Sequence, residues 1–234
     1  RLLNVGLSAM ASCMGLVAGG VTLLAGRPSQ GKSAALVSIL RYVARHRLVA
    51  YCATLEMTAM ELTDRILSAE ASVPYFRMLS GNISAEQRTA IIDRSCDVAS
   101  WNIDFDDRPG MTLAQISASA RRQKRRHGRL DLLAIDYLQL VTPDSEKENR
   151  VEQLDKIARS CKRIARELQV PVLGLVQVNR QATDNADSRP RLQNLKGSGG
   201  FEEHSDSVVF VHRPAWYKME KPATGQPENA EIIV

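Results

Sequence analysis

Gly26-Arg27-Pro28-Ser29-Gln30-Gly31-Lys32-Ser33 matches the pattern G-x-x-x-x-G-K-[ST] of a phosphate-binding loop. The octapeptide follows an apolar run and opens a helical pattern, as such a loop requires. Glycines let the backbone curl so that its N–H groups face phosphate oxygens, and the N-terminus of the following helix adds partial positive charge. We therefore predict a site for ATP, with Lys32 between the β- and γ-phosphates and the Ser33 hydroxyl as a ligand of Mg²⁺. The alternative is a glycine turn that only starts a helix.

Apolar, β-rich segments alternate with helical patterns along the chain, which is typical of an α/β fold with a mostly parallel sheet and helices on both faces. Strands are predicted at residues 21–25, 49–55, 130–135, 170–176, 207–212 and 230–234. Apolar positions three and four apart predict helices at residues 32–45, 59–71, 85–100, 113–127 and 150–168. Thr58 and Thr112 fit N-caps, and Ser84 with Gln87 fits a capping box. The polar segments 142–149 and 179–200 are predicted loops.

Polar side chains also follow three other predicted strands. Asp136 ends an apolar run and is predicted to complete the Mg²⁺ shell. Because Tyr137 follows it instead of a glutamate, we assign the catalytic carboxylate to Glu56, which could orient or deprotonate the attacking water. Gln177 ends another run, where a neutral amide could sense the γ-phosphate or position water. Each residue taken singly is typical of the surface at a strand end. Open α/β sheets bind ligands at the carboxyl ends of their strands, so we expect the groups to converge.

Four segments together resemble the C-terminal ATPase domain of the bacterial and phage replicative helicases of the DnaB family. They are the phosphate loop, Leu55-Glu56-Met57, Ile135-Asp136-Tyr137-Leu138-Gln139-Leu140 and Gln177-Val178-Asn179-Arg180. The resemblance covers nearly the whole chain and extends to residues 107–112, 148–150 and 189–206. It implies one RecA-like domain over residues 1–234 and a 5'-3' DNA helicase motor, assembled as a homohexameric ring around single-stranded DNA with ATP at the subunit boundaries.

The resemblance also implies roles for single residues. Glu56 corresponds to the catalytic glutamate, Asp136 to the Mg²⁺ ligand and Gln177 to a sensor that links the γ-phosphate to DNA. Arg65 corresponds to a further contact near the γ-phosphate. By itself, Arg65 would be interpreted as a solvated helix residue.

Two features bear on nucleic acid. The family holds the DNA backbone with a loop that faces the central channel, and the matching residues here are Lys196, Gly197, Ser198 and Gly199. Gly197 stands where the family commonly has an acidic residue, and a flexible surface loop is the alternative. A second group of cations falls in the last turns of a predicted helix, where they complement the helix dipole, so we interpret it as a solvated face. This basic cluster is Arg121, Arg122, Lys124, Arg125, Arg126 and Arg129.

Composition agrees with a globular domain in a reducing, cytoplasmic setting. Apolar residues make up 44% of the 234 residues, and no apolar run approaches the length of a membrane span. The 4 cysteines lie far apart without a C-x-x-C pair, which argues against a structural zinc and a disulfide framework. A formal net charge of +5 indicates an anionic partner or a solvated basic face.

The sequence starts at Arg1 and stops at Val234 within a strand pattern, so we interpret it as part of a longer protein. The resemblance implies an N-terminal domain that recruits primase, a helicase loader, and a C-terminal basic finger, all outside this segment. Two other functions stay open: a RecA-type recombinase ATPase that forms filaments, and a non-motor ATP-binding switch. The presence of Lys32, Glu56 and Asp136 together counts against the switch.

Overall fold

The fold is built on a seven-stranded sheet with the strand order β5-β4-β6-β7-β3-β8-β9. The computed structural model describes residues 2–3, 16–143, 148–178, 189–195, 199–214 and 230–234. The strands, in sheet order, are β5 (Ile103–Asp106), β4 (Ala50–Thr54), β6 (Leu132–Asp136), β7 (Val172–Gln177), β3 (Val21–Gly26), β8 (Ser207–His212) and β9 (Glu231–Ile233). Neighbouring strands are parallel except β9, which runs antiparallel to β8. The prediction of a mostly parallel sheet is therefore confirmed.

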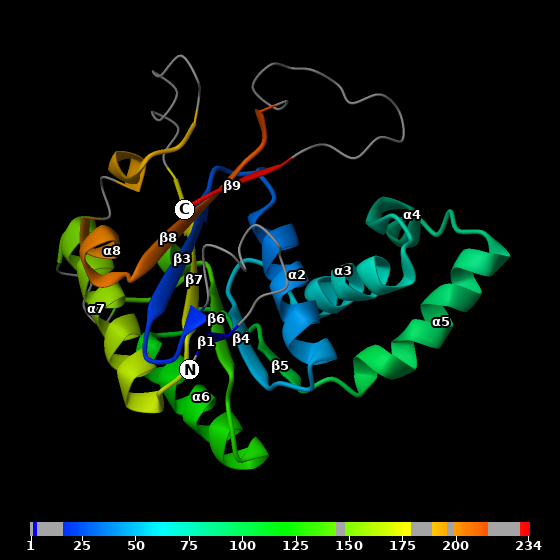
Figure 1. Ribbon diagram of the computed structural model, residues 1–234, viewed down its shortest axis with the longest axis horizontal. Coiled ribbons are helices and arrows are strands. Elements are labelled where there is room, and N and C mark those ends of the chain that lie inside the picture. Colours follow the sequence, from blue (N-terminus) through cyan, green and yellow to red (C-terminus); the bar gives the residue numbers. More distant parts are fainter. Residues whose placement is uncertain (1, 4–15, 144–147, 179–188, 196–198, 215–229) are drawn as a thin grey trace.

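Helices cover both faces of this sheet (Figure 1). Side chains of α2 (Lys32–Arg45) and α3 (Ala59–Ala71) join the buried cluster on one face, and those of α6 (Leu113–His127) and α7 (Arg150–Leu168) join the cluster on the other. Consecutive residues of β3 alternate between the clusters, because side chains of a strand point to opposite faces in turn. The central strands are buried on both faces, which explains their nearly continuous apolar runs.

Every predicted strand and helix has a counterpart in the structure, with ends shifted by at most two residues. The N-caps Thr58 and Thr112 are confirmed, each within a capping box, and so is the box of Ser84 and Gln87 at the start of α5 (Ala85–Ala99). Four short elements are not predicted from the sequence: β5, the helix α4 (Tyr75–Leu79) and a small pair of strands, β1 (Leu2–Leu3) and β2 (Leu16–Val17). These elements are too short to show a clear period.

The predicted loop 179–200 is partly wrong. Within its described part, a 3-10 helix, η3, spans Leu192–Leu195, and α8 (Gly199–His204) begins before the loop was expected to end. Leu195 is 3% and Phe201 1% exposed, so apolar anchors in a polar, glycine-rich segment stabilise regular structure here. In the described residues of the other predicted loop, 142–149, no helix or strand forms before α7. None of the helices in the described part of the chain is long and apolar enough to cross a membrane.

Candidate nucleotide site

The phosphate loop and the polar residues that were expected to join it lie at the ends of four strands that are neighbours in the sheet. Gly26 ends β3, Asp136 ends β6 and Gln177 ends β7, while Glu56 follows β4 by two residues. Gln177 is the register partner of Gly26, and Asp136 is the register partner of Thr54. Because these strands are adjacent and parallel, the structure brings all four groups to the same edge of the sheet.

The backbone of the phosphate loop needs glycine at both of its glycine positions. A Cβ atom on Gly26 would lie 3.1 Å from Cγ of Lys32 and 3.2 Å from the carbonyl oxygen of Val211. Gly31 has a φ of 99°, in the left-handed region that side chains disfavour. The chain thereby turns from β3 into α2 within a few residues, and the free N–H groups of the first turn of α2 lie at the loop.

Lys32 is folded back onto its own loop. Its Nζ atom donates hydrogen bonds to the carbonyl oxygens of Gly26 at 2.9 Å and Arg27 at 3.2 Å. Burial lowers the pKa of Lys32 from its ordinary value, and the negative charges of Asp136 and Glu56 oppose this change. The ammonium group is therefore within electrostatic reach of both carboxylates, which is the arrangement that the three residues need to act on one triphosphate.

Asp136 is a buried carboxylate without a complete set of partners. The residue is 1% exposed, and no hydrogen bond reaches its Oδ2 atom from the described residues. Burial, and secondly the charge of Glu56, raise the pKa of Asp136 to about 6, against the charge of Lys32. A buried carboxylate with an unpaired oxygen is costly unless a cation meets it. Carboxylate and hydroxyl oxygens are ligands that Mg²⁺ accepts, so Asp136 and Ser33 fit the predicted metal.

Glu56 is exposed in a short connection that is held on both sides. The backbone N–H of Leu55 donates to the carbonyl oxygen of Asp136 at 2.6 Å. On the other side, the hydroxyl of Thr54 donates to the carbonyl oxygen of Met57 at 2.6 Å. The carboxylate of Glu56 can therefore move while its backbone stays fixed relative to Asp136.

A family model described as the DnaB-like helicase C terminal domain matches residues 3–234. The chain belongs to this family. The recognition made from the sequence motifs is thus confirmed.

Several curated relatives are proteins named replicative DNA helicase DnaB. The one from Leifsonia xyli is 38% identical over 221 residues, which are 94% of this chain and 48% of that protein. Those from Rickettsia bellii and Rickettsia typhi are 32% and 34% identical over 223 residues, covering 90% of this chain and 45% of each relative. The chain therefore spans about half the length of the curated relatives it matches.

Two solved structures share the fold. One, described as an ATPase domain, has a TM-score of 0.85 at 26% identity and covers 92% of this chain and 81% of its own. The other, described as a DnaB-like replicative helicase and its interactions with primase, has a TM-score of 0.85 at 26% identity and covers 93% of this chain and 55% of its own. This likeness confirms the predicted RecA-like fold.

Arg65, which only the resemblance singled out, lies on α3 and faces a tyrosine. Its guanidinium carbon is 4.6 Å from the centre of the Tyr75 ring, and its Nε atom is buried without a hydrogen-bond partner among the described residues. In the described part of the chain no hydrogen bond or ion pair joins Arg65 to the phosphate loop. Its role at the γ-phosphate stays a prediction.

The residues predicted to hold DNA are only partly described. Lys196, Gly197 and Ser198 lie outside the described residues, and Gly199 is the first residue of α8. The prediction of a DNA-contacting loop therefore stays a prediction.

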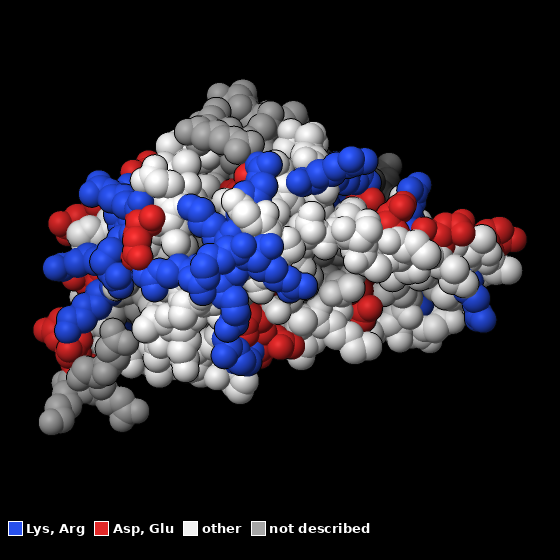
Figure 2. Space-filling view, turned by 90° about the horizontal axis from the view of Figure 1, so that it is seen from below, with Lys and Arg blue, Asp and Glu red and all other residues white. Residues whose placement is uncertain are grey.

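The basic cluster lies at the end of α6, on the face where Figure 2 shows Lys and Arg side chains gathered. Most of its members have partners within the chain. Arg121 pairs with Glu167 at 2.6 Å, Arg126 with Asp104 at 3.5 Å and Arg129 with Asp131 at 2.5 Å. Lys124 donates to a backbone carbonyl oxygen at 2.6 Å. These contacts agree with the interpretation as a partly neutralised, solvated face.

Two residues that support the site, Arg213 and Gln139, are not predicted from the sequence as site residues. Arg213, which follows β8, donates its backbone N–H to Oε1 of the buried Gln30 at 2.7 Å, and its Nη1 atom donates to the carbonyl oxygen of Ser29 at 3.1 Å. Gln139 contacts the backbone of Gln177. Both contacts depend on which strands are neighbours, and this order is not written in any local pattern.

Proposed function

We propose that this chain is the ATP-driven motor domain of a hexameric replicative DNA helicase, coupling ATP hydrolysis at subunit boundaries to 5'-3' movement on single-stranded DNA. The observation that carries the proposal is that Lys32, Asp136 and Glu56 lie within electrostatic reach of one another at one edge of the sheet, in a chain of this family. A chain that only bound nucleotide would have no need for all three charged groups at one site.

Residues 26–33 bind the triphosphate in this proposal. The backbone N–H groups of the loop and of the first turn of α2 donate to phosphate oxygens, and Lys32 exchanges its bonds to Gly26 and Arg27 for bonds to the β- and γ-phosphates. Ser33 and Asp136 would hold Mg²⁺, which would neutralise part of the negative charge of the bound triphosphate.

Glu56 is the group that acts on water. Its exposed carboxylate orients a water molecule toward the γ-phosphorus and accepts a proton from it, while ADP leaves on the opposite side. Gln177, one strand from the phosphate loop, senses whether the γ-phosphate is present. Arg65 lies on the helix that follows Glu56, and in this proposal it swings from Tyr75 to the same phosphate.

The DNA contact is assigned to Lys196, Gly197, Ser198 and Gly199. Backbone N–H groups at small residues can approach phosphates closely, and such contacts follow a strand without reading its bases. Assembly as a homohexamer, action in the cytoplasm, and work with a primase and a helicase loader through other parts of the protein belong to the same proposal. One of the similar solved structures is described with primase.

A forked DNA substrate tests the proposal. The full-length protein should unwind a fork that carries a free 5' tail and fail on one with only a 3' tail, and the Lys32→Ala variant should unwind neither. Closed rings on single-stranded DNA in electron micrographs are expected, whereas open filaments would favour a recombinase. Nucleotide-dependent binding to a protein, with no affinity for DNA, would favour the switch.

A further inference from the structure

The side chain of Gln139 forms two hydrogen bonds with the backbone of Gln177, and we call this pair of contacts the clasp. Its Nε2 atom donates to the carbonyl oxygen of Gln177 at 3.0 Å, and its Oε1 atom accepts from the N–H of Gln177 at 3.3 Å. Gln139 lies in η1 (Leu138–Leu140), directly after β6, while Gln177 ends the neighbouring strand β7. One amide thus satisfies both backbone groups of the last residue of β7, at the point where that strand leaves the sheet.

Arg150 connects this clasp to the first turn of α7. Its Nη2 atom donates to the carbonyl oxygen of Gln139, and its Nη1 atom donates to Oε1 of Gln153 at 3.3 Å. Gln153 in turn donates to the carbonyl oxygen of Glu148 at 3.0 Å. The start of α7 and the end of β7 are therefore joined through polar contacts of Gln139 and Arg150.

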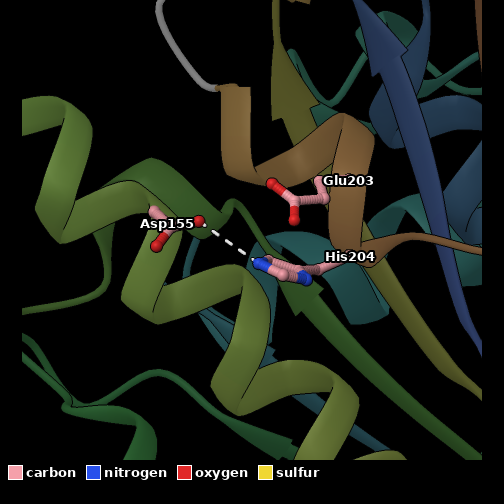
Figure 3. Close-up of side chains that lie close together, drawn as sticks. All are labelled: Asp155, Glu203 and His204. Carbon is pink, nitrogen blue, oxygen red and sulfur yellow. Dashed lines mark ion pairs between the residues drawn. The ribbon is translucent and has the colours of Figure 1, made fainter.

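Asp155, in the next turn of α7, contacts α8. A Cβ atom on Gly200 would lie 2.5 Å from Cα of Asp155, so the two helices touch backbone to backbone. Nε2 of His204 lies 3.2 Å from Oδ1 of Asp155, as the dashed line in Figure 3 marks, with the Glu203 carboxylate on the same side. Arg159 pairs with the other carboxylate oxygen of Asp155. α8 begins at Gly199, the last of the residues proposed to hold DNA, so a shift of α7 that moves α8 also moves the end of that segment.

We propose that Gln139 and Arg150 are positioning residues: through the clasp and its link to α7 they make Gln177 and α8 move together. Contacts at the side chain of Gln177 displace its backbone, which is hydrogen-bonded to Gln139. Arg150, bonded to the carbonyl oxygen of Gln139, transmits this displacement to the first turn of α7. Asp155 then transmits it to Gly200 and His204 of α8. The clasp rests on the proposed function, because it assumes that Gln177 responds to nucleotide. It adds the route by which this response reaches α8.

Hydrogen exchange measured by mass spectrometry tests the clasp without relying on hydrolysis or DNA. The full-length protein is saturated with the β,γ-imido analogue of ATP, after its affinity has been measured for each variant. Exchange is followed in peptides that cover α7 and α8. Gln139→Met removes both amide contacts at similar volume, and Arg150→Ala removes the link to α7. Arg150→Lys keeps one donor for the carbonyl oxygen of Gln139.

Gln169→Met is the matched control. Gln169 caps the other end of α7, and within the described residues its amide donates to the carbonyl oxygen of Arg166 at 2.7 Å. In the wild-type protein and in this control, the analogue should slow exchange in α8 by about threefold or more, a size that reports altered local opening. Gln139→Met and Arg150→Ala should lose most of this slowing, and Arg150→Lys should regain part of it.

The outcomes separate the clasp from the proposed function. The proposed coupling would be overturned, and the motor proposal left intact, by one result. It is that Gln139→Met or Arg150→Ala binds the analogue and still shows the wild-type slowing of hydrogen exchange in α8. A wild-type protein that binds the analogue without any change in α8 would also overturn the clasp. A wild-type protein that binds no analogue would overturn the proposed function, and the clasp with it.

Discussion

The backbone N–H of Leu55 donates a hydrogen bond of 2.6 Å to the carbonyl oxygen of Asp136. Leu55 precedes the candidate catalytic glutamate, and Asp136 is the candidate metal ligand, so one backbone contact fixes the two backbones that carry these carboxylates relative to each other. The register pair of Thr54 and Asp136 in the sheet supports the same spacing. Catalytic groups act best when they are held in a productive orientation, and the fixed backbones provide this while leaving the Glu56 side chain free to respond to nucleotide.

Replacing Glu56 by Gln should stop turnover without stopping binding. The amide keeps the size of the side chain but cannot accept a proton from water, and loss of a general base typically costs about a hundredfold or more in rate. We expect nucleotide affinity within about threefold of the wild type, because the proposed role of Glu56 is toward water and not toward the phosphates. A Glu61→Gln variant, in the first turn of α3, serves as the control. Unchanged steady-state hydrolysis in Glu56→Gln would assign the base to another residue.

Replacing Asp136 by Asn should make the metal-free protein more stable at neutral pH. The folded-state pKa of about 6 lies above the ordinary value of 3.8, so the folded protein holds this proton more tightly than the unfolded chain does. As the pH rises from about 4 to about 6, ionisation of the buried carboxylate removes stability, by about 3 kcal/mol in total. The amide of the variant would stay neutral throughout.

Chemical denaturation of both proteins across this pH range, with EDTA, measures the difference. The variant should be favoured above pH about 6, and the advantage should disappear below pH about 4. Carboxyl groups whose pKa is lowered, such as Asp106 beside Arg108, have the opposite pH dependence but contribute equally to both proteins. An advantage that is independent of pH would show that Asp136 is not the titrating group. Addition of Mg²⁺ and ATP should stabilise the wild type and not the variant.

Much of the site could be predicted from the sequence because its residues end apolar runs. Gly26, Asp136 and Gln177 each mark the end of a buried strand, and parallel strands place such ends at one edge of the sheet. The prediction that Glu56 is the catalytic carboxylate rests on one further observation, that no glutamate follows Asp136. Arg65 could not be predicted in this way, because one arginine on an amphipathic helix has no distinguishing pattern.

The contacts between elements could not be predicted, because they depend on strand order. The clasp of Gln139 on Gln177 exists only because β6 and β7 are neighbours, although the two positions are 38 residues apart in the chain and the whole of α7 lies between them. The start of α8 falls in the predicted loop 179–200, whose Asp, Asn, Ser, Pro and Gly content includes Gly200. In the structure it is a contact point, where Asp155 leaves no room for a side chain.

Gly174 should tolerate no side chain unless Leu138 gives way. A Cβ atom at position 174, in β7, would lie 2.5 Å from Cδ1 of Leu138, which is in η1. Gly174→Ala should therefore destabilise the protein by about 1–3 kcal/mol through overpacking. Leu138→Ala alone should cost about 2–5 kcal/mol through the cavity it leaves.

The double variant tests whether these two costs have one origin. Gly174→Ala together with Leu138→Ala should cost less than the sum of the two single changes, since the added methyl group occupies part of the cavity. Urea denaturation of the four proteins gives the coupling free energy. Strict additivity would mean that the two side chains do not share this space.

ATP hydrolysis with and without single-stranded DNA, over a range of protein concentrations, tests the central claim most directly. The full-length protein should hydrolyse ATP faster with DNA and cooperatively with its own concentration, because the proposed sites are completed at subunit boundaries. The Glu56→Gln protein should bind ATP, but its hydrolysis should show neither the stimulation by DNA nor the cooperative dependence on protein concentration. Hydrolysis that is proportional to protein concentration and indifferent to DNA would contradict the ring motor, and the nucleotide switch would then be the better account.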